Sequence, residues 1–434
     1  MHRLHKKKYS FNAEKDSKLL QERGIGFEKN LTLFIKIMTN TRFIAWLIWI
    51  VASIFYAYQY ILRVMPSIMM NDIMQQFNID AKIFGQFSGI YYIGYSLMHL
   101  PLGIALDRFG PKKVMSLCIL MTVLGMLPII FSDYWIYPII GRALIGMGSS
   151  AAILGLFKII RMSFSEQYFP RMLSFSVTIG LIGAIYGGGP VDYMSNKFGY
   201  KFVIEIFAII GIILAALTYI IIPNIKRAPS GTALGDIKLV LRNKKILWTC
   251  IFAGFMVGPL EGFADVWGST FLKQVYGLEK SLASSLPSMI FIGMCFGAPL
   301  LTYIGEKTNY LRAIIGAGVV MTICFIAILS SHLSNNLIMI SFVLTGICSA
   351  YQILAIYKAS TYISESHAGI TTALANMIIM SFGYAFHSII GYIVNITGGA
   401  NDANALIYGI TIIPIALIFG SLGFLFISYK KKNF

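Results

Sequence analysis

The chain has 434 residues, of which 57% are hydrophobic and 12% are charged, and its mean hydropathy is +0.73. A soluble domain carries about 25% charged residues, so this composition excludes an ordinary soluble protein and indicates one built to contact lipid. The formal net charge of +17 would suit a nucleic-acid-binding protein, but the placement of the basic residues argues against that class.

The predicted elements are apolar stretches of roughly 20 residues, the length of a helix that crosses a bilayer. Polar and charged residues interrupt the second and the seventh of them. Twelve spans are predicted, at 43–62, 83–106, 113–131, 135–158, 172–194, 202–222, 246–270, 284–305, 312–330, 337–357, 368–394 and 404–428. The sequence therefore predicts an all-α polytopic membrane protein that has the lipid bilayer as its surroundings.

A polar segment separates the first six spans from the last six. The domains that we expect are a basic cytoplasmic tail at 1–42, an N-terminal six-helix bundle at 43–222, a cytoplasmic linker at 223–245, a C-terminal six-helix bundle at 246–428 and a basic tail at 429–434. Residues 1–40 have no apolar core, so we do not expect a cleavable signal peptide there.

The 35 lysines and arginines are distributed unevenly over the two sides of this topology. If both termini are cytoplasmic, 28 lie in the tails and cytoplasmic loops, six lie on the opposite side, and Arg142 lies inside the fourth span. This split follows the positive-inside rule and predicts cytoplasmic termini. The basic excess is thus a topology signal, and we expect no nucleic-acid partner. The abundance of Ile, Lys and Asn is typical of an AT-rich bacterial genome and so points to a bacterial inner membrane.

The segment 103–113, with the sequence Gly-Ile-Ala-Leu-Asp-Arg-Phe-Gly-Pro-Lys-Lys, joins spans 2 and 3 on the predicted cytoplasmic side. Glycine at both ends permits close approach of two helix ends, and the aspartate can pair with a cation or cap a helix. The segment resembles the signature loop between helices 2 and 3 of the major facilitator superfamily. The resemblance implies two pseudo-symmetric six-helix bundles that rock around a central site, with this loop as part of the gate. The expected gating residues are Gly103, Asp107, Arg108, Gly110 and Lys112.

The two groups of spans are related by a constant offset of 200 residues. At this offset, Gly146 and Ser149 of span 4 are matched by Gly346 and Ser349 of span 10. The same offset relates span 3 to span 9 and span 5 to span 11. A gapless register over three pairs of spans indicates an internal repeat, and parallel repeats of this kind place the substrate site near the midplane between the bundles.

Arg63 ends an aromatic run in span 1. The pattern Tyr60-x-x-Arg63 resembles the first helix of the organophosphate and organic-anion branches of the superfamily, which implies that the arginine contacts an anionic group of the substrate. A guanidinium suits this role because its planar fork binds a carboxylate or phosphate through two hydrogen bonds. In the alternative, Arg63 extends its charged end to the outer lipid interface.

Span 7 lacks the second arginine of the organophosphate branch and carries Glu261 and Asp265 instead, four residues apart on one helix face. At the offset of 200 they bracket the position equivalent to Arg63. An arginine opposite two carboxylates favours a zwitterionic substrate, and it equally fits proton coupling by a buried carboxylate. In the alternative, both carboxylates lie near the outer rim and neutralise Arg63 or Lys273.

The motif Gly-Arg-x-x-x-Gly-x-Gly at 141–148 resembles a second superfamily motif, whose arginine, here Arg142, is associated with proton coupling. An anchor at the lipid interface is the alternative for Arg142. In the matching stretch of span 10, Tyr351 and Gln352 are predicted to line the substrate cavity. His99 and His387 lie inside spans 2 and 11, where we expect a neighbouring polar group to satisfy each ring, with proton relay as the alternative.

The sequence shows no phosphate-binding loop, nucleophile–base pair or metal-ligand cluster, so we expect no enzyme activity, no cofactor and no metal. The chain is predicted to be a monomeric secondary transporter of a small anionic or zwitterionic metabolite, such as an organic acid, an amino acid or a short peptide. Proton coupling is the favoured energy source. An efflux antiporter and a non-transporting nutrient sensor of the same fold are the alternatives.

Overall fold

The computed structural model describes residues 41–165, 168–223, 233–364 and 367–430. Most of the predicted N-terminal tail, residues 224–232 of the predicted linker and the end of the C-terminal tail lie outside the described residues. The account below concerns the compact unit Trp49–Phe434.

Twelve helical spans in the described part of the chain are long and apolar enough to cross a membrane. They confirm the predicted all-α polytopic fold, and the second and seventh spans are among them. The N-terminal bundle consists of α3 (Thr41–Val64), α5 (Ala81–Phe109), α6 (Pro111–Phe131), α7 (Ile136–Ser163), α8 (Phe169–Tyr186) with α9 (Gly189–Phe198), and α10 (Tyr200–Ile221). A 3-10 turn, η1 (Met65–Ser67), and α4 (Met70–Phe77) follow α3.

The C-terminal bundle has the same number of spans, but several of them are broken into shorter helices. It consists of α12 (Lys244–Gly254) with η3 (Gly258–Trp267) and α13 (Gly268–Val275), α14 (Lys280–Ser285) with α15 (Ser288–Lys307), α16 (Tyr310–Leu329), α17 (Asn335–Ser349) with α18 (Tyr351–Ser360), α19 (Ala368–Thr397), and α20 (Ala403–Ile410) with α21 (Ile412–Lys430). The predicted linker also contains a helix, α11 (Ala233–Arg242).

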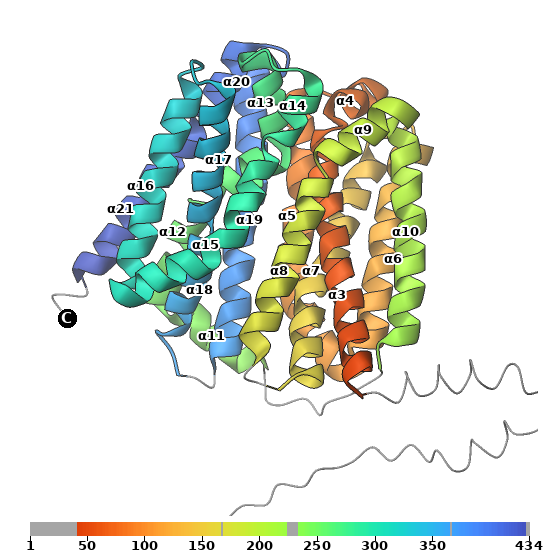
Figure 1. Ribbon diagram of the computed structural model, residues 1–434, viewed down its shortest axis with the longest axis vertical. Coiled ribbons are helices and arrows are strands. Elements are labelled where there is room, and N and C mark those ends of the chain that lie inside the picture. The colour runs from red at the N-terminus through yellow and green to blue at the C-terminus, as the bar shows by residue number, and fades with distance from the viewer. Residues whose placement is uncertain (1–40, 166–167, 224–232, 365–366, 431–434) are drawn as a thin grey trace, which may run out of the picture. The chain divides into compact units, whose positions relative to one another are not determined.

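The two bundles meet most closely where α5 lies against α19 (Figure 1). A Cβ atom added at Gly85 would come within 2.4 Å of the His387 backbone oxygen, and one at Gly391 within 2.6 Å of the Ala81 backbone oxygen. Only glycine lets the two backbones approach this closely, as small residues do at helix contacts in membranes. The bundles are also joined by α8 with α15, by α9 with α14, and by η1 with η3.

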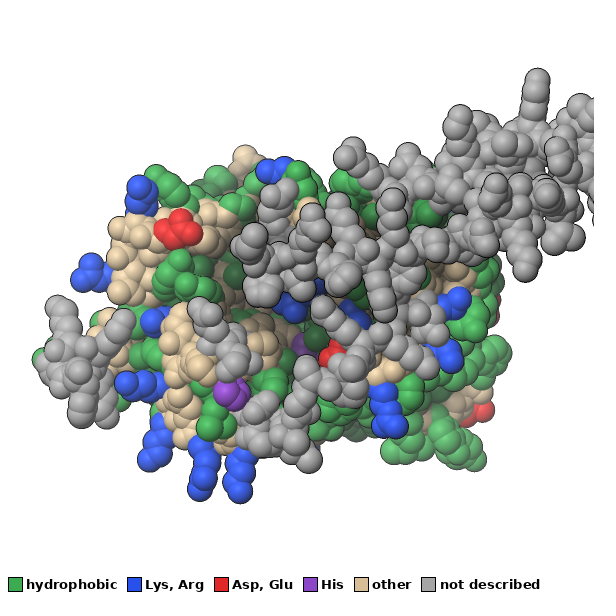
Figure 2. All heavy atoms as spheres, turned by 90° about the horizontal axis from the view of Figure 1, so that it is seen from below, with side chains coloured by type: hydrophobic (Ala, Val, Ile, Leu, Met, Phe, Trp, Pro, Cys, Tyr) green, Lys and Arg blue, Asp and Glu red, His purple; other side chains and the backbone are tan. Residues whose placement is uncertain are grey.

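The face that bears α4, α9, α13 and α14, at the top of Figure 1, is the predicted outer face. The opposite face, which α11, the end of α7 and the start of α8 border in Figure 1, is the predicted cytoplasmic face. Figure 2 looks onto this lower face and shows lysine and arginine side chains around its edge. This distribution is what the positive-inside rule describes, and the orientation itself stays a prediction.

The predicted loop at 103–113 is mostly helical. Helix α5 continues to Phe109 and α6 begins at Pro111, so Gly110 alone makes the turn, with a φ of 83° that favours glycine. A Cβ atom at Gly103 would meet nothing within 4 Å. The close helix approach that we expected at Gly103 is therefore absent, because this position is half-buried and faces open space.

Candidate functional site

Arg63 joins the two bundles through a pair of buried carboxylates. Its Nε donates to Asp265 Oδ2 at 2.5 Å, and its Nη2 donates to Glu261 Oε2 at 2.5 Å and to Asp265 Oδ1 at 3.2 Å. The arginine belongs to α3, whereas both carboxylates belong to η3 in the other bundle. No more than 6% of any of the three side chains is exposed. The three residues that the sequence singled out are thus brought together, and we call them, with Tyr92 and Arg142, the central network.

Glu261 and Asp265 bind the same guanidinium, and both lie on η3, which is a π-helix. The Gly268 amide donates to the carbonyl of Phe263, five residues earlier, as the wider turn of a π-helix requires. Such segments are rare and recur at functional sites. The spacing of the carboxylates predicted a shared face, but the sequence analysis missed the π-helix; Pro259 and the glycines around it were the available signal.

Tyr92 of α5 is a member of the central network that the sequence analysis missed. Its hydroxyl donates to Asp265 Oδ2 and lies 3.4 Å from Glu261 Oε2. The guanidinium carbon of Arg63 lies 5.5 Å from the centre of the Tyr92 ring and 4.8 Å from the centre of the Tyr60 ring. The ring face of Tyr60 therefore contacts the cation of Arg63, and the predicted role of Tyr60 in substrate binding stays a prediction.

Arg142 holds the end of the helix that carries Arg63. Its Nη1 donates to the Leu62 carbonyl at 2.6 Å and its Nη2 to the Arg63 carbonyl at 2.9 Å. The last carbonyls of a helix have no partner within the helix, and a cation there also complements the helix dipole. Arg142 is only 2% exposed and lies 4.8 Å from the centre of the Tyr91 ring. The alternative of an anchor at the lipid interface is wrong, because the side chain points into the bundle.

Two arginines and two carboxylates balance one another in the central network. Ionisable groups within a membrane are costly unless they are paired, and removing one partner of a buried pair costs about 3–5 kcal/mol. The alternative of an Arg63 directed to the lipid interface is excluded, because the side chain is 6% exposed and is paired. Glu261 neutralises Arg63, but it is fully buried, seventeen residues from the start and fourteen from the end of the span Lys244–Val275, and so does not lie at the rim.

The predicted cavity residues Tyr351 and Gln352 have different surroundings. The hydroxyl of Tyr351 donates to the Ala253 carbonyl at 2.7 Å, which joins α18 to α12 and occupies that group. Gln352 stands beside Glu261 and is 5% exposed, and its Nε2 has no hydrogen-bond partner among the described residues. Of the two, only Gln352 presents a free polar atom to the central network.

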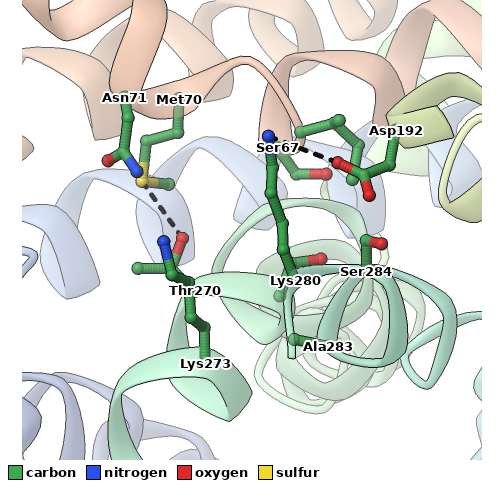
Figure 3. A pocket seen from close by; sticks show the side chains of 11 residues that line it. Ser67, Met70, Asn71, Asp192, Thr270, Lys273, Lys280, Ala283 and Ser284 are labelled. Atoms are coloured by element: carbon green, nitrogen blue, oxygen red, sulfur yellow. Dashed lines mark hydrogen bonds and ion pairs between the residues drawn. The ribbon is translucent and has the colours of Figure 1, made fainter. Parts of the chain in front are cut away.

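A small cavity of about 40 Å³ lies between the bundles, and Ser67, four residues after Arg63 in the chain, is among its lining residues (Figure 3). Ser67 and Asn71 contribute to it from one bundle, and Thr270 from the other. In Figure 3 the amino group of Lys280 points at Asp192, and the two charged atoms are 3.5 Å apart. Because α9 carries Asp192 and α14 carries Lys280, this second ion pair also joins the bundles.

The predicted gating loop makes its ion pair within one bundle. Lys158 Nζ lies 2.8 Å from Asp107 Oδ1 and donates to the Leu106 carbonyl at 2.6 Å. The charged ends of Arg108 and Lys112 lie over aromatic rings. The structure therefore brings Asp107 to Lys158 and leaves the other predicted gating residues apart from this pair.

The family model of the Major Facilitator Superfamily matches residues 43–388. The chain belongs to the major facilitator superfamily. The members are membrane transporters, so the chain is a transporter and not an enzyme. Its multi-pass membrane location agrees with the twelve apolar helices.

Several curated relatives carry names that specify an anion, and three of them are from Bacillus subtilis (strain 168). A hexuronate transporter is 22% identical, over 78% of this chain and 86% of its own length. A probable galactarate/D-glucarate transporter is also 22% identical, with 83% and 87% covered. A nitrite extrusion protein is 20% identical, with 74% and 80% covered.

Among solved structures, a bacterial homolog of the human lysosomal transporter Spinster, in an inward-facing and occupied conformation, superimposes with a TM-score of 0.71. It is 15% identical, and the match covers 88% of this chain and 96% of that one. At this identity the likeness shows the fold alone, and it confirms the arrangement of two six-helix bundles.

Proposed function

We propose that this transporter is a proton-coupled symporter that imports a small organic anion bearing a carboxylate. The observation that carries the proposal is the position of Arg63, which is buried between the bundles with Glu261 and Asp265 as its counter-ions. Two of the named relatives are a hexuronate transporter and a probable galactarate/D-glucarate transporter, and the substrates in these names are carboxylates with several hydroxyl groups.

Arg63 acts as a switch between internal and external counter-ions. In the observed state its fork is filled by Asp265 and Glu261, and this contact holds the two bundles together. When the bundles separate at the predicted outer face, the guanidinium loses these partners. The carboxylate of a substrate then takes their place, because it offers the same two oxygen atoms in the same plane.

Protons enter the cycle through the two carboxylates. Separating Arg63 from charged Glu261 and Asp265 would leave unpaired charges, at a cost of about 3–5 kcal/mol for a buried pair. Proton binding from the outer side neutralises a carboxylate and so weakens its hold on Arg63. Outward opening thereby depends on a proton, and the substrate anion and the proton move in the same direction.

The arrangement favours an anion over the zwitterion that the sequence also allowed. Both oxygens of Asp265 and one oxygen of Glu261 are engaged by Arg63 and Tyr92. A substrate ammonium group would find one free carboxylate oxygen there, beside an arginine that repels it. In the proposed cycle the protein is a monomer in a bacterial inner membrane with cytoplasmic termini, and Asp107 with its neighbours belongs to the gate on the cytoplasmic side.

The experiment that tests this function is uptake by the purified full-length chain in proteoliposomes. Radiolabelled D-glucuronate is offered from outside, with the outer solution either more acidic or more alkaline than the interior. We expect accumulation only with the acidic outer solution. Loss of uptake in Arg63→Ala, but not in the exposed cation control Lys197→Ala, is the expected pattern. Equal uptake under both gradients would refute proton symport, and full uptake by Arg63→Ala would refute the binding role.

A further inference from the structure

His387 lies on α19, at the contact between the two bundles, and its side chain is fully buried. Its ring stacks on the ring of Tyr92, with centroids 5.5 Å apart and an angle of 29° between the planes. Tyr92 in turn donates to Asp265. His387 is thus separated from the central network by one aromatic ring, although it is not itself a member.

Neither ring nitrogen of His387 has a hydrogen-bond partner within the described residues. A neutral imidazole has one donor and one acceptor, and buried side-chain polar atoms are nearly always hydrogen-bonded. The expectation from the sequence, that a neighbouring polar group satisfies His387, is therefore wrong. The ring needs a partner that the described part of the chain does not supply.

Two further buried atoms of the same bundle share this property. Glu261 uses Oε2 for Arg63, while its Oε1 has no partner, and Nε2 of the neighbouring Gln352 has none either, in the part of the chain that the structure describes. Glu261 also links this group to Tyr92. The Tyr92 hydroxyl lies 3.4 Å from Glu261 Oε2, and the Tyr92 ring stacks on the ring of His387. An acceptor and a donor therefore lie at Glu261, and His387, which can act as either, lies on the far side of Tyr92.

A hydroxyl group is the ligand group that suits this set, because it donates one hydrogen bond and accepts others. It can donate to Glu261 Oε1, accept from the Gln352 amide, and do either with His387. A carboxylate or an inorganic oxyanion only accepts, so it cannot satisfy the free oxygen of Glu261. This requirement distinguishes a hydroxylated acid from a simple anion.

We propose that Glu261, Gln352 and His387 form a subsite for the hydroxyl groups of the substrate, in the bundle opposite Arg63. This inference rests on the proposed transport of a carboxylate. The substrate then spans the two bundles, with its carboxylate on Arg63 and its hydroxyl groups on the C-terminal bundle. Closure of the bundles around it depends on both ends, so the subsite determines specificity for sugar acids over other anions.

The test compares the binding of two ligands to the purified full-length chain. D-Glucuronate carries a carboxylate and several hydroxyl groups, whereas tetrahydropyran-2-carboxylate keeps the ring and the carboxylate and has no hydroxyl group. Isothermal titration calorimetry gives the dissociation constant of each. We expect glucuronate to bind at least about tenfold more tightly to the wild type, since hydrogen bonds to buried groups are lost with the other ligand.

Two substitutions at position 387 separate the nitrogens from the ring. His387→Phe keeps a ring to stack on Tyr92 and removes both nitrogens, and it should bring the ratio of the two dissociation constants close to one. His387→Asn restores a donor and an acceptor and should recover part of the ratio. Gln352→Met should act in the same direction as His387→Phe. The exposed His332→Phe is the matched control and should keep the wild-type ratio.

Each outcome decides between the proposals. A wild-type ratio near one, with both ligands bound, would overturn the hydroxyl subsite and leave the proposed function intact. The same holds if His387→Phe weakens both ligands equally, because the ring would then have only a structural role. If the wild type binds neither ligand, the proposed transport of a carboxylate fails, and the subsite fails with it.

Discussion

Two ion pairs of the chain have similar N–O distances but differ in how far their side chains are exposed to solvent. Arg63 reaches carboxylates about 200 residues away in the other bundle, and its partners are 0% and 1% exposed. Lys158 reaches Asp107 within its own bundle, at 2.8 Å, and the Asp107 side chain is 63% exposed. A buried pair is costly to break, whereas an exposed pair contributes about 0–1 kcal/mol.

This difference separates the two contacts by role. Motion of the bundles relative to one another must break the Arg63 contact and can leave the Asp107–Lys158 contact in place. The central network is therefore suited to sense substrate and protons, because whatever binds there alters the contact between the bundles. The exposed pair is suited to shape the helix ends on the predicted cytoplasmic side.

The largest effect is expected from Arg63→Ala. The substitution removes the counter-ion of two buried carboxylates and costs about 3–5 kcal/mol in the closed state. We expect uptake of D-glucuronate in proteoliposomes to fall by at least about a hundredfold, and the melting temperature of the purified protein to fall as well. Arg63→Lys keeps the charge without the fork and should recover the melting temperature more than the uptake.

Asp265→Asn should break the link between protons and transport. An amide keeps the size of the side chain but does not titrate, so opening no longer needs a proton. Exchange of labelled for unlabelled glucuronate should persist, while accumulation driven by an acidic outer solution should fall by about tenfold or more, which corresponds to about 1.4 kcal/mol of lost driving force. If Asp265→Asn still accumulates substrate in proportion to the gradient, coupling lies elsewhere.

Arg142→Gln tests whether this residue acts through the end of α3. The variant loses charge-assisted hydrogen bonds to two carbonyls, each worth about 1.5–3 kcal/mol, so Arg63 is positioned less well. Glucuronate affinity should fall by about tenfold while the dependence on the outer pH keeps its shape. A flattened pH dependence at unchanged affinity would instead place Arg142 in the proton pathway that the resemblance implies.

The smallest effect is expected from Asp107→Asn. The Asp107 side chain in this pair is exposed, so the substitution should lower the free energy of unfolding by no more than about 1 kcal/mol. The melting temperature should therefore change little. The maximal uptake rate should fall by a few-fold at normal abundance in the membrane, because the helix ends at the gate lose one of their contacts. Wild-type rates in this variant would refute a gating role for Asp107.

Much of the fold could be predicted from the sequence, because apolar length and the placement of charges act locally. Arg63, Glu261 and Asp265 were recognisable for the same reason, since a charge within an apolar span requires a partner. Tyr92 was not, because tyrosine inside a span is common and its importance depends on which helix lies opposite. His387 was noted within its span, but its contact with Tyr92 depends on the same packing. The contact between α5 and α19, set by Gly85 and Gly391, is a tertiary feature that no local pattern records.

The π-helix that carries both carboxylates was unpredictable on similar grounds. A spacing of four residues fits one face of an α-helix, and the sequence gives no reason to widen the turn beyond the glycines and Pro259 near it. The Gly103 expectation was wrong for a related reason, since a glycine in a motif does not reveal whether a neighbour packs on it. Local patterns name the charged residues, and the packing of helices decides which of them meet.

The central claim is that the contact of Arg63 with Glu261 and Asp265 closes the outer face. Its most direct test measures how accessible the cavity of Figure 3 becomes when this contact is weakened. In a background without the five native cysteines, Ser67→Cys places a thiol in the cavity of Figure 3, and a membrane-impermeant maleimide measures its labelling rate. We predict that, at one fixed pH, Asp265→Asn raises this rate several-fold. An acidic outer solution should also raise the labelling rate in the parent, relative to the rate at which the same maleimide labels a small free thiol at that pH. An unchanged rate in Asp265→Asn, with the thiol still labelled in the unfolded protein, would contradict the claim that the Arg63 contact closes the outer face.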